Sequence, residues 1–503
     1  MDTTPLEPAG GDVEVGSCRL RTPGLEGLAT ARTQAAPGTR ASGSADPALA
    51  QAMARHNVQV QEAIEIEEAG EVPVGAYDLR TKYGEPAIAL DAPEPVNGWG
   101  QFVLAVDESG VATWNFAAPA SGPAGPAPQM RDGSHAQTYL IRRAVPPAPA
   151  PSAGEPQMRG TLGVVAKKVL EVLVFPLIDP ALGAIGEYFA AAWERDFRPY
   201  RVRDFTPEGY RSGEPGPFRA EDWGRLAGGP ALLLIHGTFS RAHEGFRDLP
   251  GDYVAQLHKL YQGRVFAFDH YTLSHDPRRN AEWFLEQIPN GAELDLHVVC
   301  HSRGGLVARA LAEKQSEFSL GSRKLRVDRV VHVAAPNAGT PMTDATHLND
   351  LIDAYTNILN FLPDSPTSLV LDGLLVVAKQ LAANTVKGLD GLQAMLPTGR
   401  FLREWLNVGT VPARYLAVAS NYRPRNSGLL SWASDRLFSR IFLGAENDLV
   451  VPTASVYDQN GSAPFPIADA RRLVFGPGDG VTHVGYFAQE RARKAILQWL
   501  SEP

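Results

Sequence analysis

From Trp223 onward, short apolar runs alternate with longer stretches in which apolar residues recur every three or four positions. Short runs of this kind are typical of buried strands, and the longer period is that of an amphipathic helix. The runs that predict strands are Ala231–Ile235, Arg264–Phe268, Leu294–Val299, Arg329–Ala335, Arg414–Ala419, Arg440–Leu443 and Arg471–Phe475. Runs almost free of polar residues indicate strands covered on both faces. The pattern predicts an α/β fold over residues 161–503, a mostly parallel sheet with helices on both faces.

The N-terminal third follows a different pattern. Residues 1–55 are rich in Gly, Ala, Pro, Thr and Ser and poor in large apolar residues, which predicts a disordered tail. Residues 56–144 contain short alternating segments and a hairpin signal at Asp107-Glu108-Ser109-Gly110, so we expect a small β-domain there. A Pro/Ala-rich linker is expected over residues 145–160, followed by a helical lead-in over residues 161–222.

Composition narrows the classes of function. A formal charge of −9 without a basic stripe argues against a nucleic-acid partner. Two cysteines cannot build a disulfide framework, and we expect Cys18 and Cys300 to stay unpaired. The N-terminus lacks the pattern of a secretory signal, and charged residues interrupt the most apolar stretches too often for a transmembrane segment. These observations predict a soluble, cytoplasmic protein.

A nucleophile is predicted at the end of the third apolar run of this alternation. Leu294–Val299 leads into Cys300-His301-Ser302-Arg303-Gly304-Gly305, and a helical pattern follows at once. Strand, sharp turn and helix with Ser at the apex form a nucleophile elbow, usually written G-x-S-x-G. Cys300 stands in place of the first Gly and is small enough for a helix to pack close behind the turn. We therefore expect Ser302 to be the nucleophile, supported by its neighbours His301 and Gly304.

A serine hydroxyl needs a base, and the base needs an orienting acid. His483 lies in a Gly-rich loop after the last predicted strand and is the expected base, in preference to His347. Asp448 follows the Arg440–Leu443 run and precedes a buried Val-Val-Pro, so we expect it to be the acid. Glu446 and Asp479 are the alternatives for that role.

Two main-chain N–H groups must hold the oxyanion that forms when the nucleophile attacks. One is expected from Arg303, the residue after the nucleophile. The other is expected from Thr238, in the loop after the first strand of the sheet. Gly237 lets that loop approach the substrate, and His236 is expected to hold the loop backbone and not to act as a second base.

The sequence indicates neither a metal nor a cofactor. His270 and His275, beside Asp269 and Asp276, could bind a divalent ion, but a solvated loop is the favoured interpretation. The chain has no Walker loop and no G-x-G-x-x-G after a strand.

Five stretches together resemble the α/β-hydrolase superfamily. They are Ala231–Ser240, His301–Gly305, Ala335–Pro341, Asn447–Pro452 and His483. The set is most similar to bacterial lipases and to the GPI-inositol-deacylase-like and lecithin–cholesterol-acyltransferase-like branches, and it covers about residues 220–500. The resemblance implies a Ser–Asp–His triad, an oxyanion loop and a turn of the PNxGTP type. It departs from the usual pattern at Cys300, and the cation Arg303 makes the leaving-group side less apolar than in a simple triglyceride lipase.

Between Pro341 and Asn407 the strand–helix alternation stops. Three apolar helical segments are predicted instead, at Leu348–Leu362, Leu369–Ala383 and Leu389–Leu406. We interpret this insertion, residues 342–407, as a helical lid, with a plain scaffold role as the alternative. A lid implies that Leu369–Ala383 faces the pocket, with Asp372, Lys379 and Gln380 turned outward.

Together these features predict a serine hydrolase that cleaves carboxylic esters of hydrophobic acyl substrates, with transient contact to a lipid interface. Two alternatives stay open at this point. The same triad can transfer the acyl group to an alcohol or cleave an amide. The domain can also serve as a binding or scaffold module without catalysis.

Overall fold

A computed structural model describes residues 3–32, 47–72, 79–82, 84–108, 110–118, 129–130, 133–143, 166–179, 184–185, 189–216, 218–361, 367–409, 413–423, 441–442, 444–459, 465 and 467–502. These residues form two compact units. The N-terminal unit contains Met1–Phe189 and Tyr355–Thr385. The C-terminal unit contains Ala190–Ala354, Val386–Arg425 and Arg436–Pro503.

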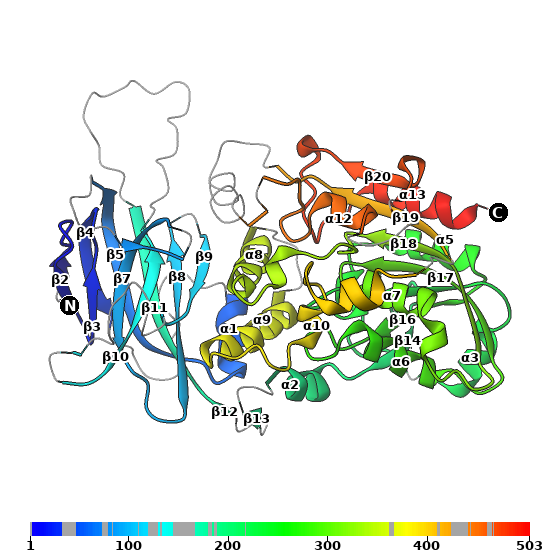
Figure 1. Cartoon of the computed structure of the whole chain (residues 1–503), viewed down its shortest axis with the longest axis horizontal. Coiled ribbons are helices and arrows are strands. Elements are labelled where there is room, and N and C mark those ends of the chain that lie inside the picture. Colours follow the sequence, from blue (N-terminus) through cyan, green and yellow to red (C-terminus); the bar gives the residue numbers. More distant parts are fainter. Residues whose placement is uncertain are drawn as a thin grey trace. The chain divides into compact units, whose positions relative to one another are not determined.

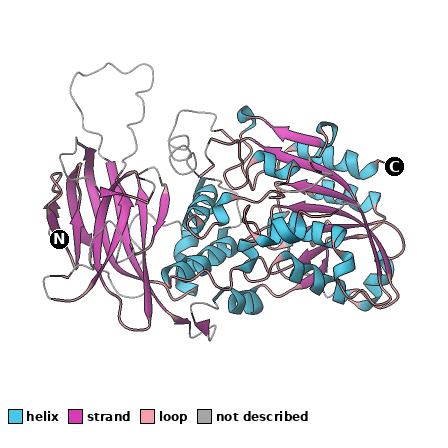
Figure 2. Ribbon diagram, viewed as in Figure 1, coloured by secondary structure: helices cyan, strands magenta, loops and turns pink. Residues whose placement is uncertain are grey.

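The C-terminal unit is built on a seven-stranded sheet (Figures 1 and 2). In spatial order its strands are β14 (Arg201–Asp204), β16 (Val265–Asp269), β15 (Ala231–Ile235), β17 (Glu293–His301), β18 (Lys324–Val333), β19 (Arg414–Ser420) and β20 (Arg472–Phe475). All neighbours are parallel except β14, which pairs antiparallel with β16 at the edge. Every residue of β15 and β16 is buried, because helices cover the sheet on both faces.

Two groups of helices enclose this sheet. One face packs against apolar residues of α4 (Ala242–Gly245), α5 (Gly251–Leu260) and α13 (Glu490–Ser501) in a single core cluster. On the central strands β15, β17 and β18 lies α7 (Gly304–Glu313), which also contacts α6 (Pro277–Gln287). The unit also contains α2 (Phe189–Phe197), whose first residue falls in the N-terminal unit, α3 (Ala220–Leu226) and α12 (Thr453–Tyr457).

The predicted α/β fold is present, and the strand Ala231–Ile235 is confirmed to the residue. Two expectations for this part of the chain are wrong. Arg440–Leu443 forms no strand in its described part, where Ile441 and Phe442 lie in a turn. The lead-in 161–222 is not purely helical, because it supplies the edge strand β14.

The N-terminal unit contains two antiparallel sheets that enclose an apolar core. The larger has the order β1 (Thr3–Pro5), β4 (Leu25–Arg32), β5 (Gln59–Glu71), β11 (Ala166–Pro176), β8 (Trp99–Asp107) and β9 (Ala112–Asn115). The smaller has the order β10 (Ala136–Arg142), β7 (Pro86–Pro93), β3 (Cys18–Arg21) and β2 (Asp12–Val15), with β6 (Leu79–Arg80) beside β7. A short pair, β12 (Ile178–Asp179) and β13 (Ala184–Ile185), lies apart from both sheets.

Three sequence expectations for this unit need correction. Residues 1–55 are not a disordered tail, since β1 to β4 come from them and Cys18 is fully buried in the core. The β-domain is not limited to residues 56–144, because β11 pairs with both β5 and β8. That strand also lies in the expected helical lead-in, residues 161–222, where a helix was predicted. The predicted linker 145–160 lies outside the described residues.

Helices cover the outer face of the larger sheet, so the unit has three layers: two sheets and one layer of helices. The helices of this layer are α1 (Pro47–Arg55), the second half of α8 (Leu348–Phe361) and α9 (Thr367–Ala382). The indole of Trp114 donates to the Thr356 hydroxyl over 3.0 Å, and the Asn357 side chain exchanges two hydrogen bonds with the main chain of Ala112. Much of the inserted segment is therefore part of the N-terminal unit.

Polar contacts to buried side chains of α9 join this helix to the end of α1. Arg55 and His56 both face the Asp372 carboxylate, at 2.8 and 3.3 Å. The Lys379 ammonium donates to the main-chain oxygen of His56 over 3.2 Å. Asp372, Lys379 and Gln380 are all buried, so the expectation that they point outward is wrong. The third predicted helix, Leu389–Leu406, is in fact the short α10 (Asp390–Gln393) and a π-helical turn at Phe401–Leu406.

Candidate active site

Ser302 stands at the apex of a sharp turn between β17 and α7, as the elbow motif predicts. Its φ of +52° lies in the left-handed region, which a residue other than Gly adopts at a cost in strain. Gly304 and Gly305 make the turn possible. A Cβ on Gly304 would lie 2.5 Å from the oxygens of Ile235 and His236, and one on Gly305 would lie 2.4 Å from the Ala335 Cβ. The turn is thus held tightly against the neighbouring strands.

The structure brings Ser302, His483 and Asp448 together in one line of hydrogen bonds. The Nε2 atom of His483 lies 2.9 Å from the Ser302 hydroxyl, and its Nδ1 atom lies 2.9 Å from Oδ2 of Asp448. Because a carboxylate only accepts hydrogen bonds, the proton of the neutral imidazole belongs on Nδ1. Nε2 is then free to accept the serine proton. All three side chains are buried.

The Asp448 carboxylate is surrounded by donors. Its Oδ1 accepts from the main-chain N–H groups of Val450 and Val451, at 3.1 and 2.8 Å. Its Oδ2 accepts from the Tyr486 hydroxyl at 2.9 Å, in addition to His483. Burial alone would raise the pKa of Asp448, but His483 and the N–H donors outweigh it and lower that pKa below its ordinary value. Asp448 is therefore an anion at neutral pH.

His301 holds the His483 loop from the other side. Its Nε2–H donates to the main-chain oxygen of His483 over 2.8 Å, and the two rings lie 5.0 Å apart. The His483 N–H in turn donates to the main-chain oxygen of Asp448 over 2.9 Å. Burial lowers the pKa of His301 to about 3, so this second imidazole stays neutral and works as a support.

Thr238 and Arg303 offer the two main-chain N–H groups expected for an oxyanion. Among the described residues, neither of these N–H groups has a hydrogen-bond partner. The loop that carries Thr238 packs closely against the elbow, since a Cβ on Gly237 would lie 2.7 Å from the Ser302 Cβ. In the same loop, Phe239 has a φ of +60°. The loop and the elbow each leave one donor for an acceptor beside the serine.

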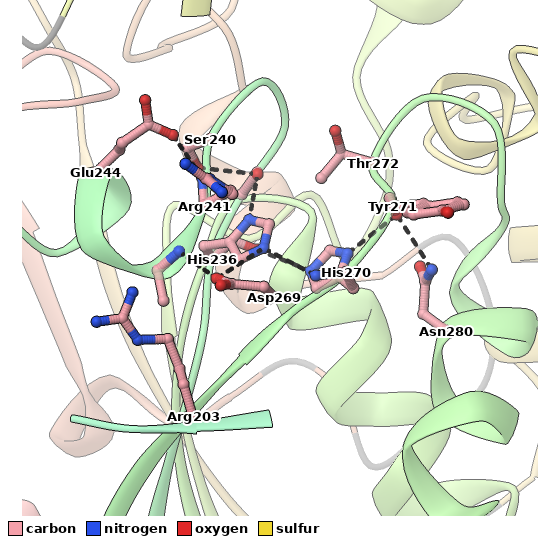
Figure 3. Close-up of polar contacts among 12 residues, drawn as sticks. Arg203, His236, Ser240, Arg241, Glu244, Asp269, His270, Tyr271, Thr272 and Asn280 are labelled. Atoms are coloured by element: carbon pink, nitrogen blue, oxygen red, sulfur yellow. Dashed lines mark hydrogen bonds and ion pairs between the residues drawn. The ribbon is translucent and has the colours of Figure 1, made fainter. Parts of the chain in front are cut away.

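Behind this loop, His236 and His270 stack with their ring centres 4.2 Å apart (Figure 3). The Nε2 atom of His236 accepts from the main chain of His270 at 3.1 Å, and its Nδ1 lies 2.9 Å from the Gly237 oxygen. Burial lowers the pKa of His236 to about 3. Asp269 accepts from the Ala242 N–H over 2.7 Å, which fixes the start of α4 beside them. His236 is thus a neutral brace for the loop.

The sequence suggested that the Arg303 side chain lies on the leaving-group side. In the structure it points elsewhere. It is fully buried, and its guanidinium donates to the main-chain oxygens of Gly391, Tyr271 and His275. Burial lowers its pKa to about 10, and the side chain remains a cation. Arg303 therefore ties the elbow to the loop after β16 and to α10.

The Ala335–Pro341 turn holds the loop that carries Asp448. The Thr340 hydroxyl donates to the Val450 oxygen over 2.6 Å, and the Asn337 amide donates to the Val456 oxygen over 2.8 Å. Leu449, directly after Asp448, has a φ of +83°. The turn thus contacts both the loop that carries Asp448 and α12, which follows that loop.

The residues set aside during the sequence analysis lie elsewhere. Asp479 accepts from the Gly476 N–H and pairs with Arg491, while exposed Glu446 accepts from Asn421. His347 pairs with Asp350 at 3.1 Å. Within the described part of the chain, no three His, Cys, Asp or Glu side chains are grouped as a metal site, and His270 packs against His236 instead.

Sequence reasoning missed three residues around this site. Tyr486 lies only three residues beyond His483, but its contact with Asp448 depends on the fold of the loop. Glu194 is fully buried and accepts the N–H groups of Thr272 and Ser274, so it shapes the loop that Arg303 holds. The Met395 sulfur lies 4.0 Å from the Thr238 hydroxyl. None of the three has a local sequence signal.

Comparisons with other proteins give a family and several structures of low similarity. A family model described as "Domain of unknown function (DUF7379)" matches residues 197–501. A comparison with curated proteins gave no match. Among the described residues, no helix is long and apolar enough to cross a membrane.

Three solved structures illustrate the range of similarity. The lipase BlEst2 of Bacillus licheniformis is 15% identical, with 60% of this chain and 98% of that chain covered and a TM-score of 0.34. Lipase 1 of Pelosinus fermentans is 13% identical, with 54% and 98% covered and a TM-score of 0.34. A carboxylesterase structure from Nitrososphaera gargenis is 13% identical, with 60% and 93% covered and a TM-score of 0.29.

Proposed function

The chain belongs to the family described as a domain of unknown function (DUF7379), and we propose that it is a serine hydrolase of the α/β-hydrolase type. In this proposal it cleaves carboxylic esters of hydrophobic acyl substrates through an acyl-enzyme. The observation that carries the proposal is the pair of 2.9 Å contacts that His483 makes with the Ser302 hydroxyl and with the Asp448 carboxylate.

Acylation follows from this arrangement. As the Ser302 oxygen attacks the ester carbonyl, its proton moves to Nε2 of His483, and the resulting imidazolium is stabilised by anionic Asp448. The carbonyl oxygen becomes an oxyanion beside the N–H groups of Thr238 and Arg303, which have no other partner among the described residues. When the tetrahedral intermediate collapses, the ester C–O bond breaks and the imidazolium gives its proton to the departing alcohol.

Deacylation repeats these steps with water. His483 removes a proton from a water molecule that attacks the Ser302 ester, and the same two N–H groups hold the second oxyanion. The acyl–serine bond then breaks, the serine oxygen regains its proton from His483, and the carboxylic acid leaves. The enzyme returns to its starting state without any cofactor.

A hydrophobic acyl group is favoured by the surroundings of the oxyanion loop. Met395 is buried and contacts Thr238, and a thioether adapts its shape to apolar chains. Gly391, in α10, packs against the main chain of Thr272 and Leu273, so this segment lies close to the Arg303 network. We propose that the lid role belongs to this returning part of the insertion, residues 386–397, rather than to α9.

Replacement of the nucleophile tests the proposal. Ser302→Ala should lower the turnover of a soluble p-nitrophenyl ester by roughly 10⁶-fold, because no other group can form the acyl-enzyme. The thermal unfolding midpoint should stay near that of the wild type, which separates lost chemistry from lost folding. Hydrolysis by Ser302→Ala within tenfold of the wild type would place the nucleophile elsewhere and overturn the proposal.

A further inference from the structure

We propose that Tyr486 is a positioning residue for the reaction, whose hydroxyl directs the Asp448 carboxylate toward His483 and shares its negative charge. This inference rests on the proposed serine-hydrolase function and deepens it. The starting observation is that the Tyr486 hydroxyl and the His483 Nδ1 meet the same oxygen, Oδ2 of Asp448, each at 2.9 Å.

The fold presents Tyr486 at this point with little freedom. Its side chain is fully buried in the core cluster, and its ring packs edge-on against Phe475 with the ring centres 6.3 Å apart. The turn between His483 and Tyr486 is closed by the Gly485 N–H, which donates to the Thr482 oxygen over 2.9 Å. One short loop thus supplies both side-chain donors to Oδ2.

The direction of the hydrogen bond follows from charge. Burial raises the pKa of the Tyr486 phenol well above its ordinary value, and the neighbouring Asp448 anion raises it further. The phenol therefore keeps its proton at any working pH and donates it toward the carboxylate. With the two N–H groups on Oδ1, the carboxylate accepts four hydrogen bonds, which fixes its plane and spreads its charge.

The electrostatic consequence falls on the imidazole. The side chains that contact His483 include Ser302, Asp448 and His301, and Tyr486 contacts Asp448 on the oxygen that His483 also meets. His301 stays neutral, so Asp448 is the charge that stabilises the imidazolium. A donor on Oδ2 holds that oxygen in one position and shares its negative charge, so the imidazole that Asp448 orients is held in one position as well.

Tyr486→Phe removes the hydroxyl and keeps the ring. We expect kcat for a soluble ester to fall on the order of tenfold with little change in KM, since a less firmly held carboxylate orients the imidazole less well. The loss should fall on kcat and not on KM, because the Tyr486 hydroxyl contacts Asp448, which acts on His483 during the chemical step.

Tyr210→Phe is the matched control. Tyr210 lies in the same core cluster and donates its hydroxyl to the main-chain oxygen of Leu249, so this variant also loses one buried hydrogen bond. It should match Tyr486→Phe in thermal unfolding yet keep the wild-type kcat and KM. A Tyr486→Phe kcat equal to that of the wild type, or a Tyr210→Phe kcat that falls equally, overturns the positioning role.

Fluorophosphonate labelling of Ser302→Ala separates this inference from the proposed function. If the label is lost in Ser302→Ala while Tyr486→Phe behaves as the wild type, only the positioning role fails. If Ser302→Ala is still labelled at the wild-type rate, the proposed function fails, and the role of Tyr486 fails with it.

Discussion

Both units bury charged side chains, but they arrange the partners of these charges differently. In the N-terminal unit, Asp372 faces the side chains of Arg55 and His56, which join two helices. In the C-terminal unit, Asp448 faces N–H groups, a phenol and an imidazole whose far nitrogen reaches a serine hydroxyl. A buried carboxylate alone therefore does not mark a catalytic group. The difference lies in whether its partners lead on to a nucleophile.

Strained backbone lies around the proposed catalytic residues. Ser302, Phe239 and Leu449 have positive φ values, and each lies in a loop beside those residues. Positive φ values next to the α1–α9 layer fall on Asn57 and Asn384, and Asn adopts the left-handed region more readily than most residues do. Strain concentrated at converging loops is expected where side chains must be held in a precise arrangement.

After loss of the nucleophile, loss of the acid should have the greatest effect on turnover. Asp448→Asn should lower kcat by about 10⁴, because an amide can donate to Nδ1 and so favours the wrong tautomer of His483. Asp479→Asn is the control, since Asp479 caps a turn and pairs with Arg491. Steady-state kinetics on a soluble ester measure both variants. A larger loss in Asp479→Asn than in Asp448→Asn would contradict the assignment of the acid.

A smaller loss is expected from the oxyanion loop. In Gly237→Ala the new Cβ would lie 2.7 Å from the Ser302 Cβ, so the loop must shift and carry the Thr238 N–H with it. We expect kcat to fall by about 10²–10³, the usual effect of losing one such donor. Gly224→Ala, in a helix with open space around the site of the Cβ, should keep full activity. Equal activities in the two variants would remove Thr238 from the oxyanion site.

The N-terminal unit should respond in stability and not in chemistry. Asp372→Ala leaves Arg55 and His56 without their shared acceptor, and we expect it to lower the free energy of unfolding by about 1–3 kcal/mol. The kcat for a short soluble ester should stay within twofold of the wild type. Asp469→Ala, whose side chain is 95% exposed, is the stability control. A tenfold loss of kcat in Asp372→Ala would show that the layer takes part in catalysis.

The smallest effect is expected at the returning part of the insertion. Met395→Ala should reduce kcat/KM for long-chain esters by a few-fold relative to short ones, because it removes apolar contact area near Thr238 at about 25 cal/mol per Å². Wild-type activity on long-chain esters should also rise at a micellar interface more than activity on short esters. Identical chain-length profiles for Met395→Ala and the wild type would argue against a lid role for this segment.

The strands of the C-terminal sheet could be predicted from the sequence because buried strands form apolar runs. Ala231–Ile235, which is covered on both faces, contains no polar residue and stands out in the sequence. A helix was predicted where β11 lies, because the segment carries Lys167, Lys168 and Glu171 at a spacing that is also found on one face of a helix. In the structure it is a central strand, and Lys168 places its ammonium on the main-chain oxygen of Arg142. Because its long side chains end in polar groups, this buried strand does not form an apolar run in the sequence.

Local motifs pointed to the residues of the candidate site, but their supports depend on tertiary contacts. Ser302 and His483 stand in stretches with a recognisable form, and the structure places their side chains 2.9 Å apart. Tyr486, Glu194 and Met395 act through partners distant in sequence or through the path of a loop. No periodicity or spacing reports such a contact. The same reason explains the error over α9, whose polar residues look solvent-facing until α1 is packed against them.

The position of a covalent adduct would identify the nucleophile. The protein of residues 1–503 is incubated with a fluorophosphonate, and its intact mass and peptide map are then measured. We predict one adduct per chain, on Ser302, with none on Ser302→Ala and slow labelling of Asp448→Asn. An adduct on another residue, or no adduct on a folded wild-type protein, would contradict the account.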